Sequence, residues 1–330
     1  MSAVNITVEL RRIAAEAEDK ETRDMAERIA EFEEQRIDAS AYSPDTVLPV
    51  DQEWAELFSK VTEEGAFAAS KMHITVCGMA RNIGGMLPTT MSRLLELKKR
   101  FRDWSLVIIE NDSTDNTKEW LAGTAKWQPE RYHFKMQDFG WKHLHGFEAE
   151  RVERYAMLRN QYREIVATDI RHTDMILAVD LDCWGGWSIP GLLNGIGWMK
   201  RYKSAACMAS TSLFQGLQVE TPDGRKTLWG HYDTWALRVH GWKHEMAPWK
   251  TAWLPPPGSP PVQLHSAFGA AAWYRPEAFF ECEYKSIDGD IEHSGLHRDM
   301  IDRGWDIYLN PAQRSLMQWV PNAKGQHDDD

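Results

Sequence analysis

The sequence has few cysteines and no long run of apolar residues. Only four of its 330 residues are cysteine, and no two of them form a Cys-x-x-Cys pair. This spacing excludes a disulfide scaffold and a cysteine-based zinc site, and it is typical of a reducing, cytoplasmic environment. No stretch approaches the roughly 18 apolar residues that a membrane-spanning helix requires, and the first residues lack the apolar core of a signal peptide. We therefore expect no transmembrane anchor.

Two nucleotide-binding motifs are missing as well. The chain has no Gly-x-x-x-x-Gly-Lys-Ser/Thr sequence, which excludes a P-loop. Its Gly84-Gly85 pair does not make the Gly-x-Gly-x-x-Gly fingerprint of dinucleotide-binding proteins. P-loop ATPases and nicotinamide-dependent dehydrogenases are therefore disfavoured.

Acidic residues outnumber basic ones, but unevenly along the chain. The net charge is −11, and nearly all of the excess lies in residues 1–70. This segment predicts helices over residues 6–37 and 52–63, so we expect an acidic helical N-terminal appendage. It would pack on the rest of the chain, dimerise or bind a partner protein. The remainder is close to neutral, so the overall charge does not exclude an anionic substrate.

From residue 72 onward, short apolar runs alternate with helical patterns. The strand candidates are residues 74–79, 105–109 and 175–179, and the helix candidates are residues 87–101, 113–121, 147–166 and 296–303. We expect Ser113 or Asp115 to cap the second of these helices. The alternation predicts an α/β fold with a mostly parallel sheet flanked by helices.

Polar residues follow each of the three predicted strands. In an open α/β sheet, ligands bind at the carboxyl ends of the strands, so these residues should meet at one edge. The sharpest cluster is Asp180-Leu181-Asp182, directly after an apolar strand. Carboxylates at i and i+2 of an extended chain share one side and can together bind a divalent cation such as Mn²⁺ or Mg²⁺. A capped turn without a metal is the alternative.

Several of these motifs together resemble a known family. The strand end Glu-Asn-Asp-Ser-Thr-Asp-Asn-Thr at residues 110–117, Arg159 on a helix, and Asp180-Leu181-Asp182 resemble GT-A-fold glycosyltransferases. The segment Tyr-Asp-Thr-Trp-Ala-Leu-Arg at residues 232–238 is similar to the fungal capsule-type α-1,3-mannosyltransferase family. The resemblance covers residues 72–312. It implies a nucleotide-binding half at 71–204 and an acceptor-binding half at 205–330.

The resemblance also implies roles for individual residues. Donor-binding roles fall on Arg81, Glu110, Asn111, Asp112, Arg159 and Asp180. The cation would be held by Asp180 and Asp182, and His297 or His327 would complete the metal shell. Asp233 would contact the donor sugar or the acceptor. An inverting reaction needs a general base, for which Glu292 or Asp290 is the candidate, whereas a retaining reaction needs none; the mannosyltransferase resemblance leans toward retention.

The sequence thus predicts a metal-dependent glycosyltransferase that uses a nucleoside-diphosphate sugar, either GDP-mannose or a UDP-sugar. The acceptor is expected to be a glycan or a glycolipid head group, with a hydroxylated base in DNA as an alternative. Two rivals remain. A nucleotidyltransferase would use the same strand-end aspartates, and a non-catalytic carbohydrate-binding protein would use the 16 tryptophans alone.

Overall fold

The computed structural model describes residues 42–317, except 145, 147, 171 and 243–246, together with isolated positions between 11 and 30. The helices expected over residues 6–37 lie largely outside the described residues, and His327 lies outside them entirely. Within the described part, no helix is long and apolar enough to span a bilayer.

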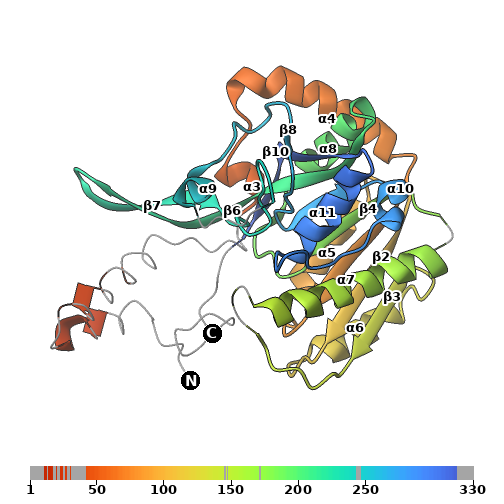
Figure 1. Cartoon of the computed structure of the whole chain (residues 1–330), viewed down its shortest axis with the longest axis horizontal. Helices are drawn as coiled ribbons and strands as arrows, with labels where there is room; N and C mark the ends of the chain where they lie inside the picture. The colour runs from red at the N-terminus through yellow and green to blue at the C-terminus, as the bar shows by residue number, and fades with distance from the viewer. Residues whose placement is uncertain are drawn as a thin grey trace.

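The core of the molecule is one ten-stranded sheet with the order β3-β2-β1-β4-β9-β6-β10-β5 (Figure 1). The first four strands in that order are parallel, and they are β1 (His73–Ala80), β2 (Asp103–Asn111), β3 (Tyr132–Gln137) and β4 (Met175–Asp180). The other half is mixed because β9 runs antiparallel to both of its neighbours; it contains β5 (Gly186–Trp187), β6 (Ala205–Thr221), β9 (Ala271–Tyr274) and β10 (Asp306–Leu316). At the margins, β7 (Gly224–His231) pairs with β6, and β8 (Val262–Leu264) pairs with β10. The predicted α/β class is confirmed, and the expected parallel pairing holds for the half that carries the predicted site.

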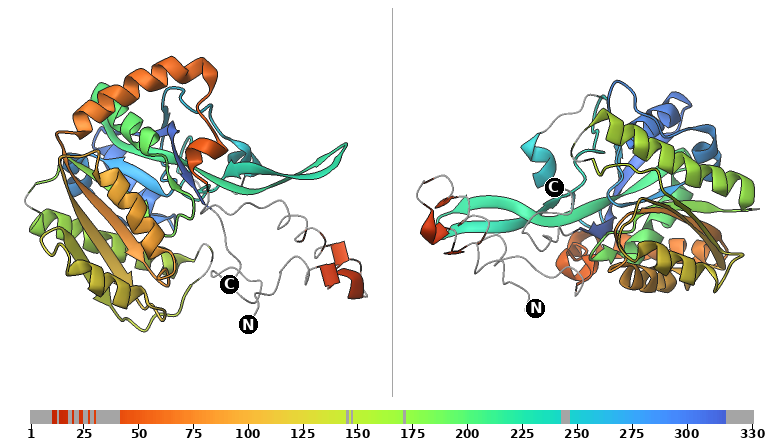
Figure 2. Two further views of the ribbon diagram at one scale, coloured as in Figure 1. Left: turned by 180° about the vertical axis from the view of Figure 1, so that it is seen from behind. Right: turned by 90° about the horizontal axis from the view of Figure 1, so that it is seen from below.

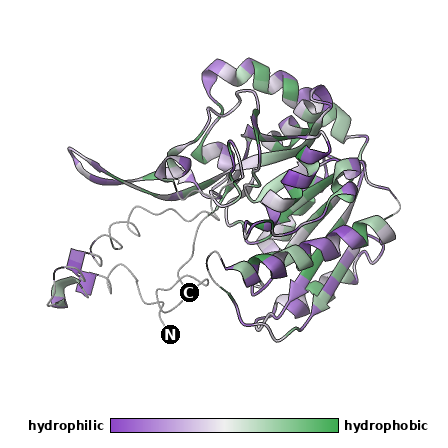
Figure 3. Ribbon diagram, viewed as in Figure 1, coloured by the Kyte–Doolittle hydropathy of each residue, from purple (hydrophilic) through white to green (hydrophobic). Residues whose placement is uncertain are grey.

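Both faces of the sheet are buried, which explains why the strands read as continuous apolar runs. In β2, Leu106 and Ile108 belong to one hydrophobic core, whereas Val107 and Ile109 belong to the other. Successive side chains of a strand point to opposite faces, so each apolar run contributes to both cores. Figure 3 shows these hydrophobic strands at the centre, between helices with polar outer faces.

Helices cover each face of the sheet. One core is closed by α4 (Ala55–Ala69), α5 (Leu87–Lys98), α6 (Thr117–Ala125) and α8 (Ile189–Arg201). The other is closed by α7 (Ala149–Asp169), α10 (Pro276–Glu281) and α11 (Glu292–Asp302). Three short elements complete the described part, namely α3 (Pro44–Val47), η2 (Gln52–Trp54) and α9 (Pro248–Ala252).

Two helix starts differ from the predicted ones. The helix expected from residue 113 begins at Thr117, because residues 113–116 form a turn against the loop after β1, and Asp115 accepts the Thr117 N–H at 2.9 Å. The last helix begins at Glu292, earlier than expected. Gly295 weakens the helical pattern in the sequence, but its missing side chain lets α11 approach the carbonyl of Lys285.

The end of the acidic segment packs on the body of the protein. Helix α4 lies against α8, and glycines make the close contact. A Cβ on Gly65 would overlap the carbonyl oxygen of Leu193, and one on Gly197 would overlap that of Val61. Of the three roles expected for residues 1–70, packing on the rest of the chain is the one that α4 fulfils.

A long hairpin projects from the sheet. Strands β6 and β7 pair from Leu213 and His231 near the body to Thr221 and Gly224 at the tip, and Figure 2 shows this ribbon extending away from the rest of the sheet. Its returning strand, β7, leads directly into the segment that contains Asp233.

Candidate functional site

Three strand ends meet at one edge of the sheet, as predicted. The register pairs Ala80 at the end of β1 with Glu110 on β2, and Met79 with Asp180 at the end of β4. The polar segments that follow these strands are therefore neighbours in space.

The loops after β1 and β2 are bonded to each other. Asn82 accepts the Thr114 N–H at 2.8 Å and donates its own N–H to Ser113 Oγ at 2.9 Å. Glu110 is fully buried, and its Oε1 accepts the Ser113 N–H at 2.8 Å. The second carboxylate oxygen of Glu110 has no hydrogen-bond partner within the described residues. Glu110 thus shapes the turn rather than presenting a free carboxylate at the surface.

Asp112 organises the next loop. Its Oδ1 accepts the N–H groups of Phe139 and Gly140, both at 2.8 Å, and its Oδ2 accepts a hydrogen bond from Asn111 at 3.0 Å. Burial would raise the pKa of Asp112, but these hydrogen bonds outweigh it, and the pKa is lowered. Asp112 is therefore a carboxylate at neutral pH, held beside a loop that Arg81 also contacts through the carbonyl of Trp141.

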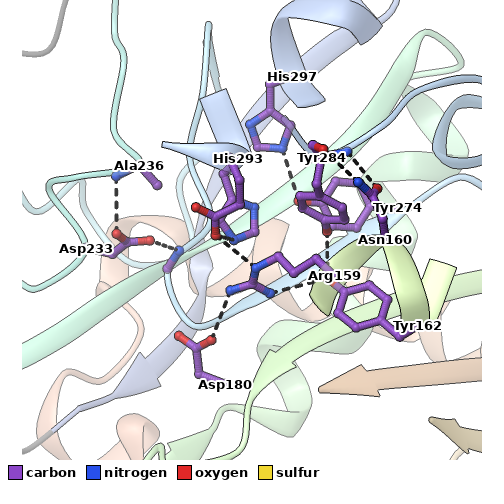
Figure 4. A network of polar contacts seen from close by, with 12 residues as sticks. Arg159, Asn160, Tyr162, Asp180, Asp233, Ala236, Tyr274, Tyr284, His293 and His297 are labelled. Carbon is purple, nitrogen blue, oxygen red and sulfur yellow. Dashed lines mark hydrogen bonds and ion pairs between the residues drawn. The ribbon is translucent and has the colours of Figure 1, made fainter. Parts of the chain in front are cut away.

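Arg159 lies at the centre of the site (Figure 4). It comes from α7, and its Nε donates to Glu292 Oε1 at 3.0 Å, while one terminal nitrogen lies 3.6 Å from Asp180 Oδ1. The other terminal nitrogen donates to Tyr162 Oη at 3.3 Å, and Tyr162 donates to Tyr284 Oη. A buried guanidinium with these partners is fixed in orientation.

The aspartate motif after β4 is anchored by the residue between its two carboxylates. Leu181 packs under Gly78, where a Cβ would clash with the Leu181 side chain, and its carbonyl accepts the Thr90 hydroxyl at 2.9 Å. Asp180 remains partly exposed and Asp182 is exposed. Burial, and next the negative charge of Asp182, raise the pKa of Asp180 to about 7.

Asp233 is held by backbone groups. Its Oδ2 accepts the N–H of Gly269 at 2.8 Å and its Oδ1 that of Ala236 at 3.3 Å. Burial nevertheless raises its pKa. Asp233 also adds to the negative charge felt by Asp180, as does Glu292. The structure therefore brings the carboxylates of Asp180, Asp233 and Glu292 close to Arg159, and Asp182 lies beside Asp180.

Two other predicted residues have partners inside the protein. Asp290 is buried and forms a two-point ion pair with Arg238, which leaves it poorly suited to the role of general base. His297 is fully buried; its Nδ1 bonds with Ser266 Oγ at 2.8 Å and its Nε2 with Tyr274 Oη at 3.0 Å. Both ring nitrogens are thus occupied, and burial lowers the pKa of His297 to about 3. The geometry gives His297 a structural contact in place of the expected metal contact.

The donor set that remains for a cation is small. The described residues contain no group of three or more His, Cys, Asp or Glu side chains placed to hold a metal ion. Two carboxylates, Asp180 and Asp182, stand at the strand end, and the unfavourable charge between them raises the pKa of Asp180. Mg²⁺ commonly binds to one or two carboxylates together with water and substrate phosphates. The residues present fit a cation that arrives with a phosphate ligand.

Some residues of the site carry no signal in the sequence. Phe268 stacks on His293 with ring centroids 4.0 Å apart, and the guanidinium of Arg159 lies over the Phe268 ring at 5.0 Å. Tyr284 contributes its hydroxyl from the loop before α11. These residues come from apolar or irregular segments, where sequence patterns indicate only burial.

Comparison with known proteins finds similarity in fold only. No protein-family model matches the sequence, and no curated protein matches it. A structure of GalNAc-T7 with UDP, GalNAc and Mn²⁺ has a TM-score of 0.49 and 13% identity, and the match covers 85% of this chain and 56% of that one.

Two further structures are similar over much of the chain. The mannosyltransferase PcManGT from Pyrobaculum calidifontis, in complex with GDP-Man and Mn²⁺, has a TM-score of 0.42, 12% identity and coverages of 82% and 68%. TarS from S. aureus has a TM-score of 0.41, 10% identity and coverages of 75% and 60%. The chain therefore spans between about half and two thirds of the length of these three structures.

Proposed function

We propose that this protein is a metal-dependent glycosyltransferase that moves a sugar from a nucleoside-diphosphate sugar to a hydroxyl group of a glycan or glycolipid. The observation that carries the proposal is the charge imbalance at the carboxyl edge of the sheet. Asp180, Asp233 and Glu292 lie there close to the buried guanidinium of Arg159, and Asp182 adds a further negative charge beside Asp180. A divalent cation bound with a diphosphate would complete this arrangement.

The strand-end aspartates would hold the cation. We assign Asp180 and Asp182 to it, because their charges act on each other at the strand end, and Mn²⁺ or Mg²⁺ would stabilise the negative charge that develops on the leaving diphosphate. Arg159, fixed by Glu292 and Tyr162, would orient the donor beside Asp180. Arg81 and Asp112 would flank the nucleotide, because both bind the loop over residues 139–141. Residues 71–204 would thus bind the donor, and residues 205–330 the acceptor.

Asp233 is the residue that we assign to the acceptor hydroxyl. It is partly exposed, and its raised pKa makes it a better proton acceptor than an ordinary aspartate. Glu292 and Asp290, the other two candidates, are both buried in ion pairs with arginine. In an inverting reaction Asp233 would take the proton of the hydroxyl, and in a retaining reaction it would position the hydroxyl. The anomeric configuration of the product distinguishes the two.

The donor can be identified without knowing the acceptor. Thermal unfolding of the full chain is measured with GDP-mannose, UDP-glucose, UDP-N-acetylglucosamine, ADP-glucose and TDP-glucose, each with Mn²⁺ or with EDTA. A ligand at 100 times its Kd stabilises the folded state by about 2.7 kcal/mol. We expect one nucleotide class to raise the unfolding midpoint only with Mn²⁺, and the resemblance of residues 232–238 favours GDP-mannose.

A matched pair of variants tests whether the effect belongs to this site. Asp182→Asn removes one charge from the exposed end of the motif, and Asp223→Asn removes one from the tip of the hairpin. The Mn²⁺-dependent shift should be lost in the first variant and kept in the second. Equal shifts in both variants would exclude the metal role of Asp182.

The rival functions give different results in the same experiment. A nucleotidyltransferase would respond to nucleoside triphosphates and release pyrophosphate. A carbohydrate-binding protein would respond to free glycans equally with Mn²⁺ and with EDTA, and Asp182→Asn would not affect it. Transfer of labelled sugar to hydroxymethylated duplex DNA, tested beside glycan acceptors, would identify a DNA base as the acceptor.

A further inference from the structure

A second pocket lies away from the carboxyl edge of the sheet. It has a volume of about 220 Å³ and is lined by the segment after Arg238, by β8 and the residue after it, and by the end of α11 with the start of β10. The lining side chains that matter here are His240, Gln263, His265, Ile301, Trp305 and Asp306. We call this the α11 pocket.

The α11 pocket is separated from the site described above by the length of α11. This helix begins at Glu292, beside Arg159, and Ile301 lies nine residues further on. At 1.5 Å per residue, the two positions are about 14 Å apart along the helix axis. Asp306 stands at the start of β10, paired in parallel with Ala205 at the start of β6. The pocket is thus near the amino ends of these strands.

The aromatic and imidazole groups of the pocket suit a flat, partly apolar ligand. Trp305 is half-buried and packs against the core, as does Ile301. Trp242 and Arg298 do not line the pocket, but Trp242 packs on the lining residue His265 with ring centroids 5.1 Å apart, and the guanidinium of Arg298 lies over Trp242. An indole offers a flat apolar face with one hydrogen-bond donor at its edge, which is the surface on which sugar rings stack.

The polar groups of the pocket favour a neutral ligand with hydroxyl groups. Asp306 accepts hydrogen bonds from Gln263 at 2.7 Å and from Ser204 at 2.5 Å, which fixes its carboxylate at the rim. This fixed negative charge disfavours a phosphate or carboxylate ligand. The amide of Gln263 and the carboxylate of Asp306, beside the indole of Trp305, are together suited to the hydroxyl groups of a sugar.

We propose that the α11 pocket binds a neutral saccharide at a site separate from the carboxyl edge. Binding there does not depend on the transferase reaction. The next step rests on the proposed function. If the protein is a glycosyltransferase, the saccharide in the α11 pocket is a sugar unit of the acceptor glycan, at a distance from the unit that receives the new sugar. The α11 pocket would then select acceptors longer than a single sugar.

The test is saturation-transfer NMR on the full chain without nucleotide or metal. The probes are methyl α-mannopyranoside, methyl β-glucopyranoside and N-acetylglucosamine, with inorganic phosphate as competitor. We expect at least one saccharide to receive saturation, and phosphate to leave its signal unchanged. Trp305→Ala and His265→Leu should each weaken binding at least tenfold.

Two control variants separate the α11 pocket from other surfaces. Trp127→Ala removes an indole that is 73% exposed and lies outside the pocket, and Asp182→Asn alters the carboxyl edge. Both should bind the saccharide as the unmodified protein does. Unfolding midpoints are recorded for every variant, and if Trp305→Ala does not fold, Gln263→Ala, at an exposed residue, replaces it with an expected loss of at least threefold.

Three outcomes would overturn the proposal. They are absence of binding by all three saccharides, displacement by phosphate, and loss of binding in Asp182→Asn but not in the pocket variants. The Mn²⁺-dependent response to nucleotide sugars is measured separately, so failure of the α11 pocket and failure of the transferase function can be told apart.

Discussion

The Nε atom of Arg159 donates a hydrogen bond to Oε1 of Glu292 at 3.0 Å, although the two residues are 133 positions apart in the chain. Each side chain is only 5% exposed. Arg159 comes from α7, and Glu292 is the first residue of α11, so the pair joins two helices at the edge where the strand ends meet. Loss of Arg159 therefore leaves the charge of Glu292 buried without its cationic partner.

This ion pair should therefore contribute strongly to stability. We expect Arg159→Gln to lower the free energy of unfolding by about 3–5 kcal/mol, because Glu292 stays buried with its charge unpaired. The matched control is Arg201→Gln, which breaks the solvent-exposed pair of Arg201 with Glu64 and should cost much less, because water screens this pair. Urea unfolding curves measure both values. Similar losses in the two variants would contradict the assigned burial.

The raised pKa of Asp180 predicts a pH dependence of stability. The pKa is 3.8 without the folded environment and about 7 in the folded protein, so the folded state binds more protons between these values. The free energy of unfolding should therefore fall as the pH rises from about 4 to about 7. In Asp180→Asn this part of the slope should disappear. The test is the free energy of unfolding of both proteins at a series of pH values. If it changes with pH equally in both, the prediction is wrong.

A divalent cation should reverse this loss of stability. Above about pH 7 Asp180 is mostly ionised, and a bound cation would offset both the burial of its charge and the repulsion from Asp182. We expect Mn²⁺ to raise the unfolding midpoint of the unmodified protein more at pH 8 than at pH 5. The control is Asp180→Asn, in which the difference between the two pH values should be absent.

His297 predicts the opposite trend in acid. Burial lowers its pKa from 6.5 to about 3, so the unfolded state binds more protons between these pH values. Its contribution to stability is complete above about pH 6.5 and is lost as the pH falls toward 3. His297→Gln should reduce this acid sensitivity, whereas His172→Gln, at a side chain that is 62% exposed, should leave it unchanged. Acid unfolding monitored by circular dichroism distinguishes the two.

The packing of α4 on α8 can be tested with two glycines. Gly197→Ala should destabilise the protein, because the added Cβ would overlap the carbonyl of Val61, and neither backbone can yield easily. Gly123→Ala, in α6, meets nothing within 4 Å and should stabilise the protein by about 0.5–1 kcal/mol through helix propensity. If α4 packs on α8 as described, thermal unfolding should show a lower midpoint for Gly197→Ala and a higher midpoint for Gly123→Ala than for the unmodified protein.

The sequence predicted three of the four strands in the parallel half of the sheet and missed β3. The runs at residues 74–79, 105–109 and 175–179 became β1, β2 and β4 because buried parallel strands need apolar side chains on both faces. The meeting of their polar ends follows from the same rule, since parallel strands place their carboxyl ends at one edge. The helices between them were also found, with their ends shifted by turns that no periodicity indicates.

The strands in the second half of the chain were not predicted from the sequence, for a physical reason. Strands β6, β9 and β10 bring together residues far apart in the sequence, and β9 is only four residues long. No local pattern specifies that such a segment enters the centre of the sheet in the antiparallel direction. Likewise nothing local places Trp305 beside His265 in the α11 pocket.

The sequence by itself determined which residue types follow each strand of the parallel half, and hence that carboxylates gather at one edge. The tertiary structure decided which of them remain available. In the sequence, Asp290 and His297 are candidate site residues just as Asp233 is. In the folded protein, the carboxylate of Asp290 is paired with Arg238, and the ring nitrogens of His297 bond with Ser266 and Tyr274. A buried polar group requires partners, and only the packing of distant segments determines whether the protein supplies those partners or leaves the group for a ligand.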